Sequence, residues 1–132
     1  MGFMKHDFST ITIAELRERL FHNNFPSKDF WIFHLYEGID VDADREGPEF
    51  YPYGPRISCV SDGMYKGERI IDLTYGINSN NQYIGFRDVM EVAKEHNFPD
   101  TTKIYLRKFR SFEFQPIKNI YSCFDLIFFE PY

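Results

Sequence analysis

Residues 30–36 have the sequence FWIFHLY, a short and nearly continuous run of aromatic and aliphatic side chains. The length of the run and its aromatic and β-branched side chains favour a strand over a helix. Because apolar residues occupy nearly every position, both faces of this strand are expected to be buried. The segment therefore predicts a central strand, around which the rest of the fold packs.

One helix is expected before this strand and one after it. Thr12 and Glu15 form a capping-box pattern ahead of an apolar stripe, so a first helix begins there and ends near residues 22–24. A second helix is predicted at residues 85–96, where apolar side chains recur at helical spacing. Further strands are predicted at residues 56–61, 68–75, 103–114 and 120–129.

The resulting order, α-β-β-β-α-β-β, predicts an α+β fold in which two helices pack on one mostly antiparallel sheet of about five strands. A hairpin should join strands 56–61 and 68–75 through a turn around Asp62 and Gly63. With 132 residues, 43% of them hydrophobic and 19% aromatic, the chain is predicted to be a single domain, residues 1–132, with its own core.

The two expected helices end in similar sequences. HNNFP at residues 22–26 follows the first helix, and HNFP at residues 96–99 follows the second. The similarity fits two explanations: a shared way of ending a helix with asparagine and proline, or the duplication of one α-β unit. So short a match leaves both explanations open.

Cys59 and Cys123 are the only cysteines, and each lies in an apolar segment without a metal-type cysteine pair, which predicts buried, unpaired thiols. The first ten residues contain no apolar core of signal-peptide length. No apolar run reaches the roughly 18 residues that a membrane helix needs. These features predict a reduced, cytoplasmic protein without a membrane partner.

The stretch with the most distinctive chemistry is residues 37–53, EGIDVDADREGPEFYPY, in which six carboxylates and one arginine lead into three aromatic side chains. Carboxylates attract a basic partner over a distance, and rigid aromatic side chains then supply contact area at low entropic cost. The stretch is therefore predicted to bind a protein partner, through residues Asp40, Asp42, Asp44, Glu46, Glu49, Phe50, Tyr51 and Tyr53.

Some of these carboxylates have the alternate spacing with which a calcium loop begins. The pattern is incomplete, because Arg45 stands at the position of the turn glycine and Tyr51 at that of the bidentate glutamate. A loop that faces solvent or a partner fits the residues better. We therefore expect no metal and no cofactor.

The sequence contains no catalytic motif. Its glycines follow neither phosphate-binding pattern, and its serines lack the context of a nucleophile elbow. His34, between Phe33 and Leu35, is either a hydrogen-bonded core histidine or one half of a buried active site. The prediction is a protein that is not an enzyme, and the alternative is a small enzyme or ligand-binding domain with a pocket around His34, Tyr36 and the hairpin.

The formal net charge of −5 and the isoelectric point near 5.3 disfavour sequence-independent binding to nucleic acid. Lys103, Arg107, Lys108 and Arg110 nevertheless cluster late in the chain. Together with tyrosines they could form an RNA-binding sheet, in which aromatic rings stack on the bases and the cations neutralise the phosphates. Because the glycine and aromatic signature of RNA-binding sheets is missing, this interpretation is secondary.

A small acidic chain that is rich in phenylalanine and tyrosine and lacks a catalytic motif is similar, in composition alone, to bacterial immunity proteins and other proteinaceous inhibitors. The similarity implies a binding protein that neutralises a basic toxin or nuclease, with the five acids of residues 40–49 steering and the three aromatic residues anchoring. A further alternative is a phage-type antagonist of a host protein. The partner's identity and the oligomeric state stay open at this stage.

Overall fold

The computed structural model describes residues 9–22, 31–41, 50–77, 83–123 and 125–132, and it is an α+β structure. The helices are α1 (Ile13–His22) and α2 (Phe86–Glu95). The strands are β1 (Ile32–Leu35), β2 (Gly38–Val41), β3 (Phe50–Tyr53), β4 (Ile57–Tyr65), β5 (Glu68–Tyr75), β6 (Ile104–Lys108), β7 (Gln115–Cys123) and β8 (Leu126–Pro131).

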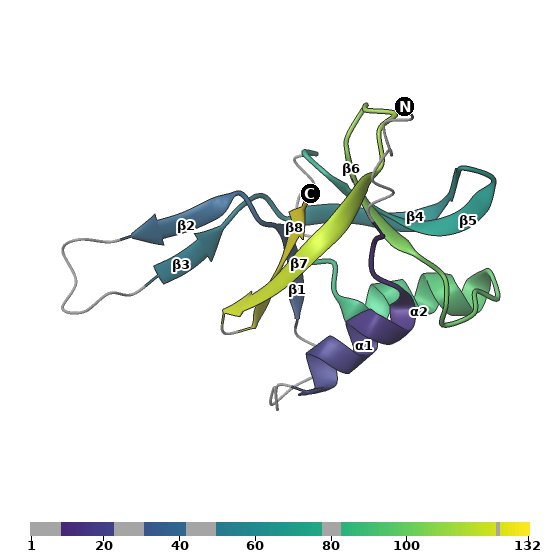
Figure 1. Cartoon of the computed structure of the whole chain (residues 1–132), viewed down its shortest axis with the longest axis horizontal. Coiled ribbons are helices and arrows are strands. Elements are labelled where there is room, and N and C mark those ends of the chain that lie inside the picture. Colours follow the sequence, from purple (N-terminus) through teal and green to yellow (C-terminus); the bar gives the residue numbers. More distant parts are fainter. Residues whose placement is uncertain (1–8, 23–30, 42–49, 78–82, 124) are drawn as a thin grey trace, which may run out of the picture.

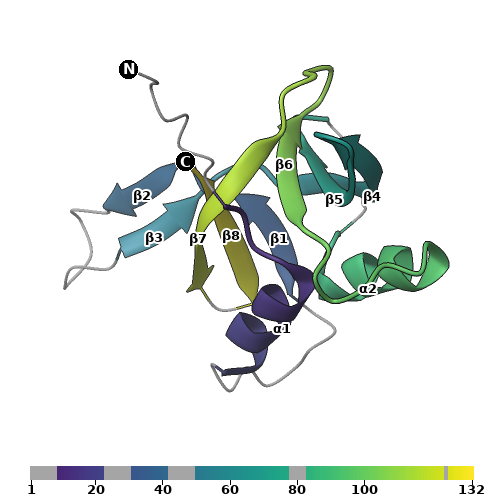
Figure 2. The same cartoon turned by 45° about the vertical axis from the view of Figure 1, so that its right-hand side comes forward.

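Six strands form a mixed sheet in the order β1-β8-β7-β6-β5-β4. The pairs β1/β8 and β5/β6 are parallel, and the other three pairs are antiparallel. The sheet curls until its two edge strands meet, because a β-bridge joins His34 to Arg56 and the Leu35 N–H donates to the Pro55 carbonyl at 2.8 Å. The result is a nearly closed barrel, with both helices at one end of it (Figures 1 and 2).

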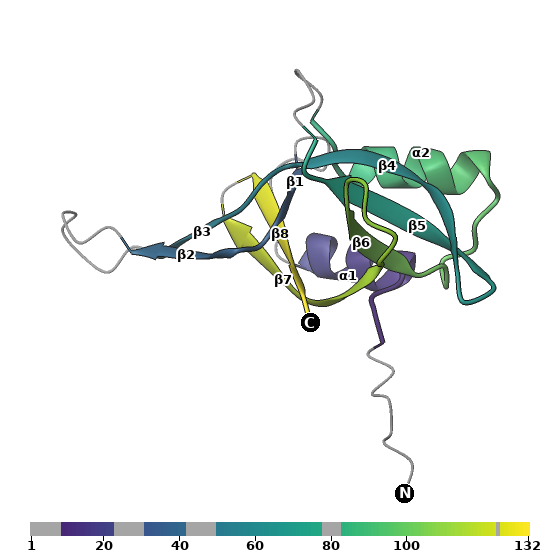
Figure 3. The same ribbon diagram turned by 90° about the horizontal axis from the view of Figure 1, so that it is seen from above.

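The remaining two strands, β2 and β3, form a separate antiparallel ribbon. This ribbon extends away from the barrel, as Figures 1 and 3 show. Two residues separate its first strand from β1, and it returns to the barrel just before β4, so it is inserted between the two edge strands of the sheet. We call this ribbon the arm.

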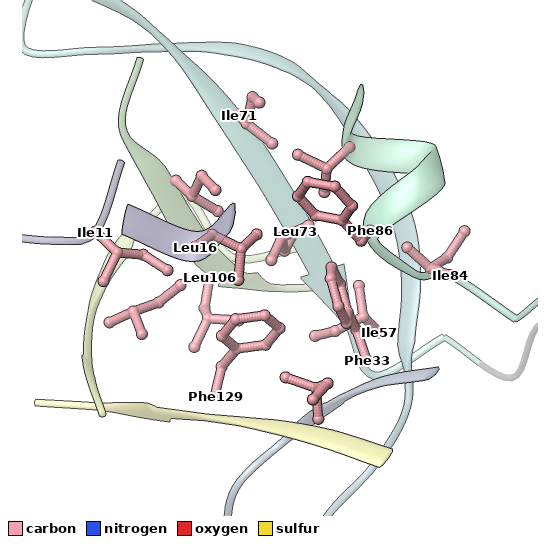
Figure 4. Packing of buried hydrophobic residues seen from close by; sticks show 14 of the residues in the cluster. Ile11, Leu16, Phe33, Ile57, Ile71, Leu73, Ile84, Phe86, Leu106 and Phe129 are labelled. Carbon is pink, nitrogen blue, oxygen red and sulfur yellow. The ribbon is translucent and has the colours of Figure 1, made fainter. Parts of the chain in front are cut away.

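The core lies inside the curled sheet and against the helices (Figure 4). Phe33 of β1 and Phe129 of β8 are fully buried and meet edge to face, with ring centroids 4.9 Å apart. Leu16 of α1 and Val89 of α2 are also fully buried, so each helix contributes its apolar stripe to the same core. Burial of this apolar surface is the main stabilising term for the fold.

The predicted helix boundaries are confirmed by the hydrogen bonds at the helix ends. At α1, the Glu15 N–H donates to the Thr12 hydroxyl oxygen at 3.2 Å. At α2, Asn97 adopts a left-handed conformation (φ 55°), and the Phe98 N–H donates to the Ala93 carbonyl at 2.8 Å. This is a Schellman ending, in which asparagine tolerates the positive φ that most side chains avoid.

The cap of α1 provides a first prediction. Replacing Thr12 with alanine removes the oxygen that accepts the Glu15 N–H, and loss of such a cap costs about 1 kcal/mol of unfolding free energy. Urea denaturation followed by far-UV circular dichroism measures this change. Thr12→Ser keeps the hydroxyl and should retain most of the stability, so equal losses in the two variants would contradict the capping role.

The predicted central position of strand 30–36 is wrong. In the sheet order β1 is an edge strand, and only one of its faces is buried: Trp31, Phe33 and Leu35 point inward, whereas Ile32 and His34 are half-exposed. The backbone N–H groups on its other edge donate to carbonyl groups of loops: that of Phe33 donates to Ile84 at 2.8 Å, and that of Leu35 to Pro55. The aromatic run was therefore compatible with two different sheet positions.

The predicted strand count and pairing also need correction, since the part of the chain that the structure describes contains eight strands and the main sheet is mixed. The β4–β5 hairpin is confirmed, but its turn lies at Lys66 and Gly67, both with positive φ, as a tight hairpin turn requires. The predicted strand 103–114 ends at Lys108. The predicted strand 120–129 is the hairpin of β7 and β8. Two strands within residues 37–53 were not predicted at all.

The cysteine prediction is confirmed only in part. Both thiols are unpaired, but Cys59 is exposed and Cys123 is half-buried. Cys59 lies on β4 opposite Thr74, on the outer face of the sheet, where an apolar flanking sequence does not ensure burial. Neither described helix has the length and apolar character that crossing a membrane requires.

Candidate functional site

The arm presents two different faces. Its register pairs Gly38 with Tyr53 and Asp40 with Tyr51, and side chains alternate along a strand. Asp40, Tyr51 and Tyr53 therefore share one face. The other face carries Ile39, which is 47% exposed. An isolated two-stranded ribbon is marginally stable in water, and exposed apolar groups of this kind are typical of binding surfaces.

Two glycines fix the geometry of the arm. A side chain at Gly54 would overlap the carbonyl oxygen of Leu35, so only glycine lets the returning strand pass this close to the end of β1. At Gly38, the Tyr53 ring covers the backbone, and a Cβ atom there would lie 2.9 Å from the tyrosine oxygen. The ring of Tyr53 is thereby held over its partner strand while 49% of the residue stays exposed.

The structure brings together three of the eight residues predicted to bind a partner. Asp40, Tyr51 and Tyr53 lie on one face of the arm. Phe50 pairs with Val41 at the outer end of the described ribbon. Asp42, Asp44, Glu46 and Glu49 lie outside the described residues.

A layer of aromatic side chains covers the outer face of the barrel next to the arm. The His34 ring lies over Phe128, with centroids 5.0 Å apart, and the Tyr36 and Tyr121 rings stack at 4.6 Å. Phe128 is only 2% exposed although it points away from the core, because these neighbours cover it. Strand β3 of the arm contacts β7, which carries Tyr121, so the arm and this layer adjoin.

A carboxylate is held beside the Tyr36–Tyr121 stack. The Asn119 side-chain amide donates to Glu130 Oε1 at 2.8 Å, and the Tyr121 hydroxyl donates to the same oxygen at 3.3 Å. Burial raises the pKa of Tyr121, and the charge of Glu130 raises it further, so the phenol stays protonated as a donor near neutral pH. We call Tyr36, Tyr121, Asn119 and Glu130 the tyrosine–glutamate cluster.

His34 occupies a structural environment. Its Nδ1 lies 3.2 Å from the Ile32 carbonyl oxygen, its ring stacks on Phe128, and its backbone is bridged to Arg56. Burial is the main cause that lowers the pKa of His34, and the nearby Arg56 charge lowers it too, against the hydrogen bond to Ile32. Two hollows on the surface, of about 460 and 510 Å³, are lined by other residues.

The lowered pKa of His34 predicts a pH dependence of stability. Because the unfolded chain takes up the proton at its ordinary pKa of 6.5 and the folded chain only at a lower pH, the folded state is favoured fully above pH 6.5 and loses stability as the pH falls below it. Urea denaturation of wild type and His34→Gln between pH 5 and 8 measures this. The variant should lose less stability on acidification, and parallel curves would contradict the assignment.

The late cluster of cations is divided in the structure. Arg107 bonds Asp72 at 2.8 Å, and Lys103 lies 3.3 Å from Glu68, whereas Lys108 is exposed at the end of β6 and Arg110 on the loop after it. Tyr65 and Tyr105 pack edge to face at 4.9 Å and both approach Phe114. The residues of the RNA interpretation are thus largely engaged in packing and ion pairs.

No group of three or more potential metal ligands occurs within the residues that the structure describes, and four of the six carboxylates of residues 37–53 lie outside them. Sequence reasoning missed the tyrosine–glutamate cluster except for Tyr36. Tyr121 and Glu130 are nine residues apart in the sequence, and only the β7–β8 register brings them together. The expected strand 120–129 could not have revealed this pairing.

Comparison with known proteins leaves the site to be interpreted on its own geometry: the chain matches no family model, no curated protein and no solved structure.

Proposed function

We propose that this protein is a non-enzymatic binding module that uses its arm to hold a basic protein, and that it acts in the cytoplasm of a bacterium as an immunity or inhibitor protein against a basic toxin or nuclease. The two strands of the arm belong to the acidic sequence of residues 37–53, and Asp40, Tyr51 and Tyr53 share one face of it. Carboxylates of this kind substitute for the phosphates that a nuclease binds with lysine and arginine.

The single observation that supports the proposal best is the exposure of the arm. It extends from the barrel as a two-stranded ribbon, and Ile39 and Tyr53 remain about half-exposed on its opposite faces. A ribbon without a core of its own gains little stability for the folded monomer. Its tyrosines and carboxylates have the composition expected of a contact surface for another protein.

The adjoining aromatic layer enlarges this surface. Tyr121 is 36% exposed beside the arm, and Glu130 places a carboxylate next to it. A specific protein interface needs roughly 800 Å² from each partner, more than a short ribbon alone supplies. The proposal therefore includes the arm together with the tyrosine–glutamate cluster.

An affinity capture at two salt concentrations tests the proposal. The purified protein is the bait. The prey is a lysate of its source organism in which any toxin encoded in a neighbouring reading frame is expressed. We expect one basic protein to be retained at low salt. Its binding should weaken at high salt, because dissolved ions screen the Coulomb attraction between exposed charges. Capture of an acidic or neutral protein whose binding does not depend on salt concentration would contradict the proposal.

A matched bait without the arm makes the test specific. Gly38 and Tyr53 are paired residues, so replacing residues 39–52 with Asn-Gly closes the ribbon by a two-residue turn and leaves the barrel unchanged. The shortened bait should keep its unfolding midpoint and lose the basic protein. Retention of the same protein by a well-folded shortened bait would exclude the arm as the binding element.

A further inference from the structure

The hydrogen-bond partners of Glu130 are neutral, whereas several other carboxylates of the described structure pair with a cation. Asp72 is paired with Arg107, Asp100 with Arg17, and Glu68 with Lys103. Glu130 is half-buried, and its hydrogen bonds within the described residues come from the neutral Asn119 amide and Tyr121 hydroxyl. A partly desolvated negative charge with neutral neighbours attracts a cation more strongly than an exposed one does.

The geometry of the carboxylate leaves room for a ligand donor. Both hydrogen bonds fall on Oε1, so Oε2 is the oxygen that an incoming N–H group would meet. Asn119 lies directly opposite Glu130 in the β7–β8 register. Since the side chain is held from two rigid strands, little conformational entropy is lost when a ligand binds.

An aromatic surface lies directly beside this carboxylate. Tyr121 both bonds Glu130 and stacks on Tyr36, at an interplanar angle of 29°. The Tyr121 ring is fixed by these two contacts, and 36% of the residue remains exposed. A fixed tyrosine ring next to a carboxylate offers two attractive surfaces for one planar cation, the ring face and the carboxylate edge.

We propose that the tyrosine–glutamate cluster is a binding subsite for an arginine side chain of the partner protein. This inference rests on the proposed function, because it names the chemistry by which the basic partner is recognised next to the arm. The guanidinium group stacks on the ring of Tyr121 and donates to Glu130 Oε2. It thereby neutralises the one half-buried carboxylate that the cluster holds ready.

Arginine fits this arrangement better than lysine. The guanidinium group is planar, stacks on aromatic faces, and presents several N–H donors in a fixed fork, whereas the lysine ammonium is a compact and strongly hydrated charge. A lysine could meet Glu130 but would gain little from the ring. The subsite therefore discriminates between the two cations rather than attracting any positive charge.

The test uses the protein alone and a defined probe. Nuclear magnetic resonance spectra are recorded while N-acetyl-arginine N-methylamide or its lysine counterpart is added, and the side-chain amide of Asn119 and the ring of Tyr121 are followed. We expect saturable shifts with a dissociation constant on the order of millimolar for the arginine probe. The lysine probe should bind about fivefold more weakly.

Variants of matched design complete the test. Glu130→Gln keeps an oxygen for Asn119 but removes the charge, and should weaken arginine binding about tenfold. Tyr121→Leu should remove the preference for arginine. Glu113→Gln changes an exposed carboxylate on the β6–β7 loop and should change nothing. Thermal unfolding confirms that each variant is folded.

The outcomes separate the subsite from the proposed function. Equal binding of the two probes, no saturable shift at Asn119 and Tyr121, or unchanged arginine binding by a folded Glu130→Gln variant would overturn the subsite. Because the titration involves no partner protein, arginine binding with failure of the affinity capture would leave the subsite standing and refute the arm. Capture of a basic protein that depends on the arm, without arginine binding in the titration, would support the proposed function and refute the subsite.

Discussion

Association of the captured partner should slow by about 10- to 100-fold at low salt when the five acids of residues 40–49 are replaced by their amides. The replaced residues are Asp40, Asp42, Asp44, Glu46 and Glu49. Charges steer the encounter of two proteins before contact is made, so their loss acts mainly on the association rate constant. The dependence of that constant on ionic strength should flatten in parallel, and stopped-flow mixing at several salt concentrations measures both.

A second variant controls for net charge. This variant replaces five other exposed carboxylates with amides and so removes the same number of negative charges. They lie on the helices, the β6–β7 loop and the β7–β8 turn: Glu18, Glu91, Glu95, Glu113 and Asp125. If the arm steers the partner, this variant should associate nearly as fast as wild type. Equal slowing by the two variants would show that only the total charge matters, and unchanged kinetics in the first would contradict steering by the arm.

Asp72→Ala should destabilise the fold by about 3 kcal/mol, since removing one partner of a buried ion pair leaves the other uncompensated. The Asp72 side chain is 6% exposed on the outer face of β5, where it accepts from Arg107 Nε at 2.8 Å and from the Thr74 hydroxyl at 3.1 Å. Arg107 also donates to the Ser111 carbonyl, so the pair ties the β6–β7 loop to the sheet. Chemical denaturation measures the loss.

The exposed pair of Arg17 and Asp100 provides the matched control. Its N–O distance of 2.9 Å is nearly the same, but the two side chains are 36% and 58% exposed. Asp100→Ala should therefore change the unfolding free energy little, because solvent screens and replaces the interaction. A loss for Asp72→Ala no larger than for Asp100→Ala would show that burial of the pair does not set its contribution.

Local signals in the sequence predicted the helices well. The Thr12–Glu15 pattern and the Asn-Phe-Pro ending both act within a few residues, and the hydrogen bonds at Glu15 and Phe98 confirm them. Sheet positions depend on partners far away in the chain. The run of residues 30–36 carries no information about its pairing with β8, almost a hundred residues later, so its edge position could not be predicted.

The candidate site was predicted as a segment but not as a surface. The composition of residues 37–53 indicated a contact region, but it did not reveal the close approaches within the arm: the backbone of Gly54 passes the Leu35 carbonyl, and the Tyr53 ring lies against Gly38. The tyrosine–glutamate cluster is assembled from β7, β8 and Tyr36, the residue that follows β1. Its stacking of Tyr36 on Tyr121 follows from strand register, which period-two patterns alone do not determine.

Amide hydrogen exchange of the free and partner-bound protein tests the central claim, that the arm and the adjoining cluster form the contact surface, most directly. The account predicts slowed exchange upon binding at residues 38–41 and 50–53 and around Tyr121 and Glu130, with α2 and the β4–β5 turn unchanged. Protection of the helices or of the β4–β5 turn, with exchange in the arm as fast as in the free protein, would contradict it.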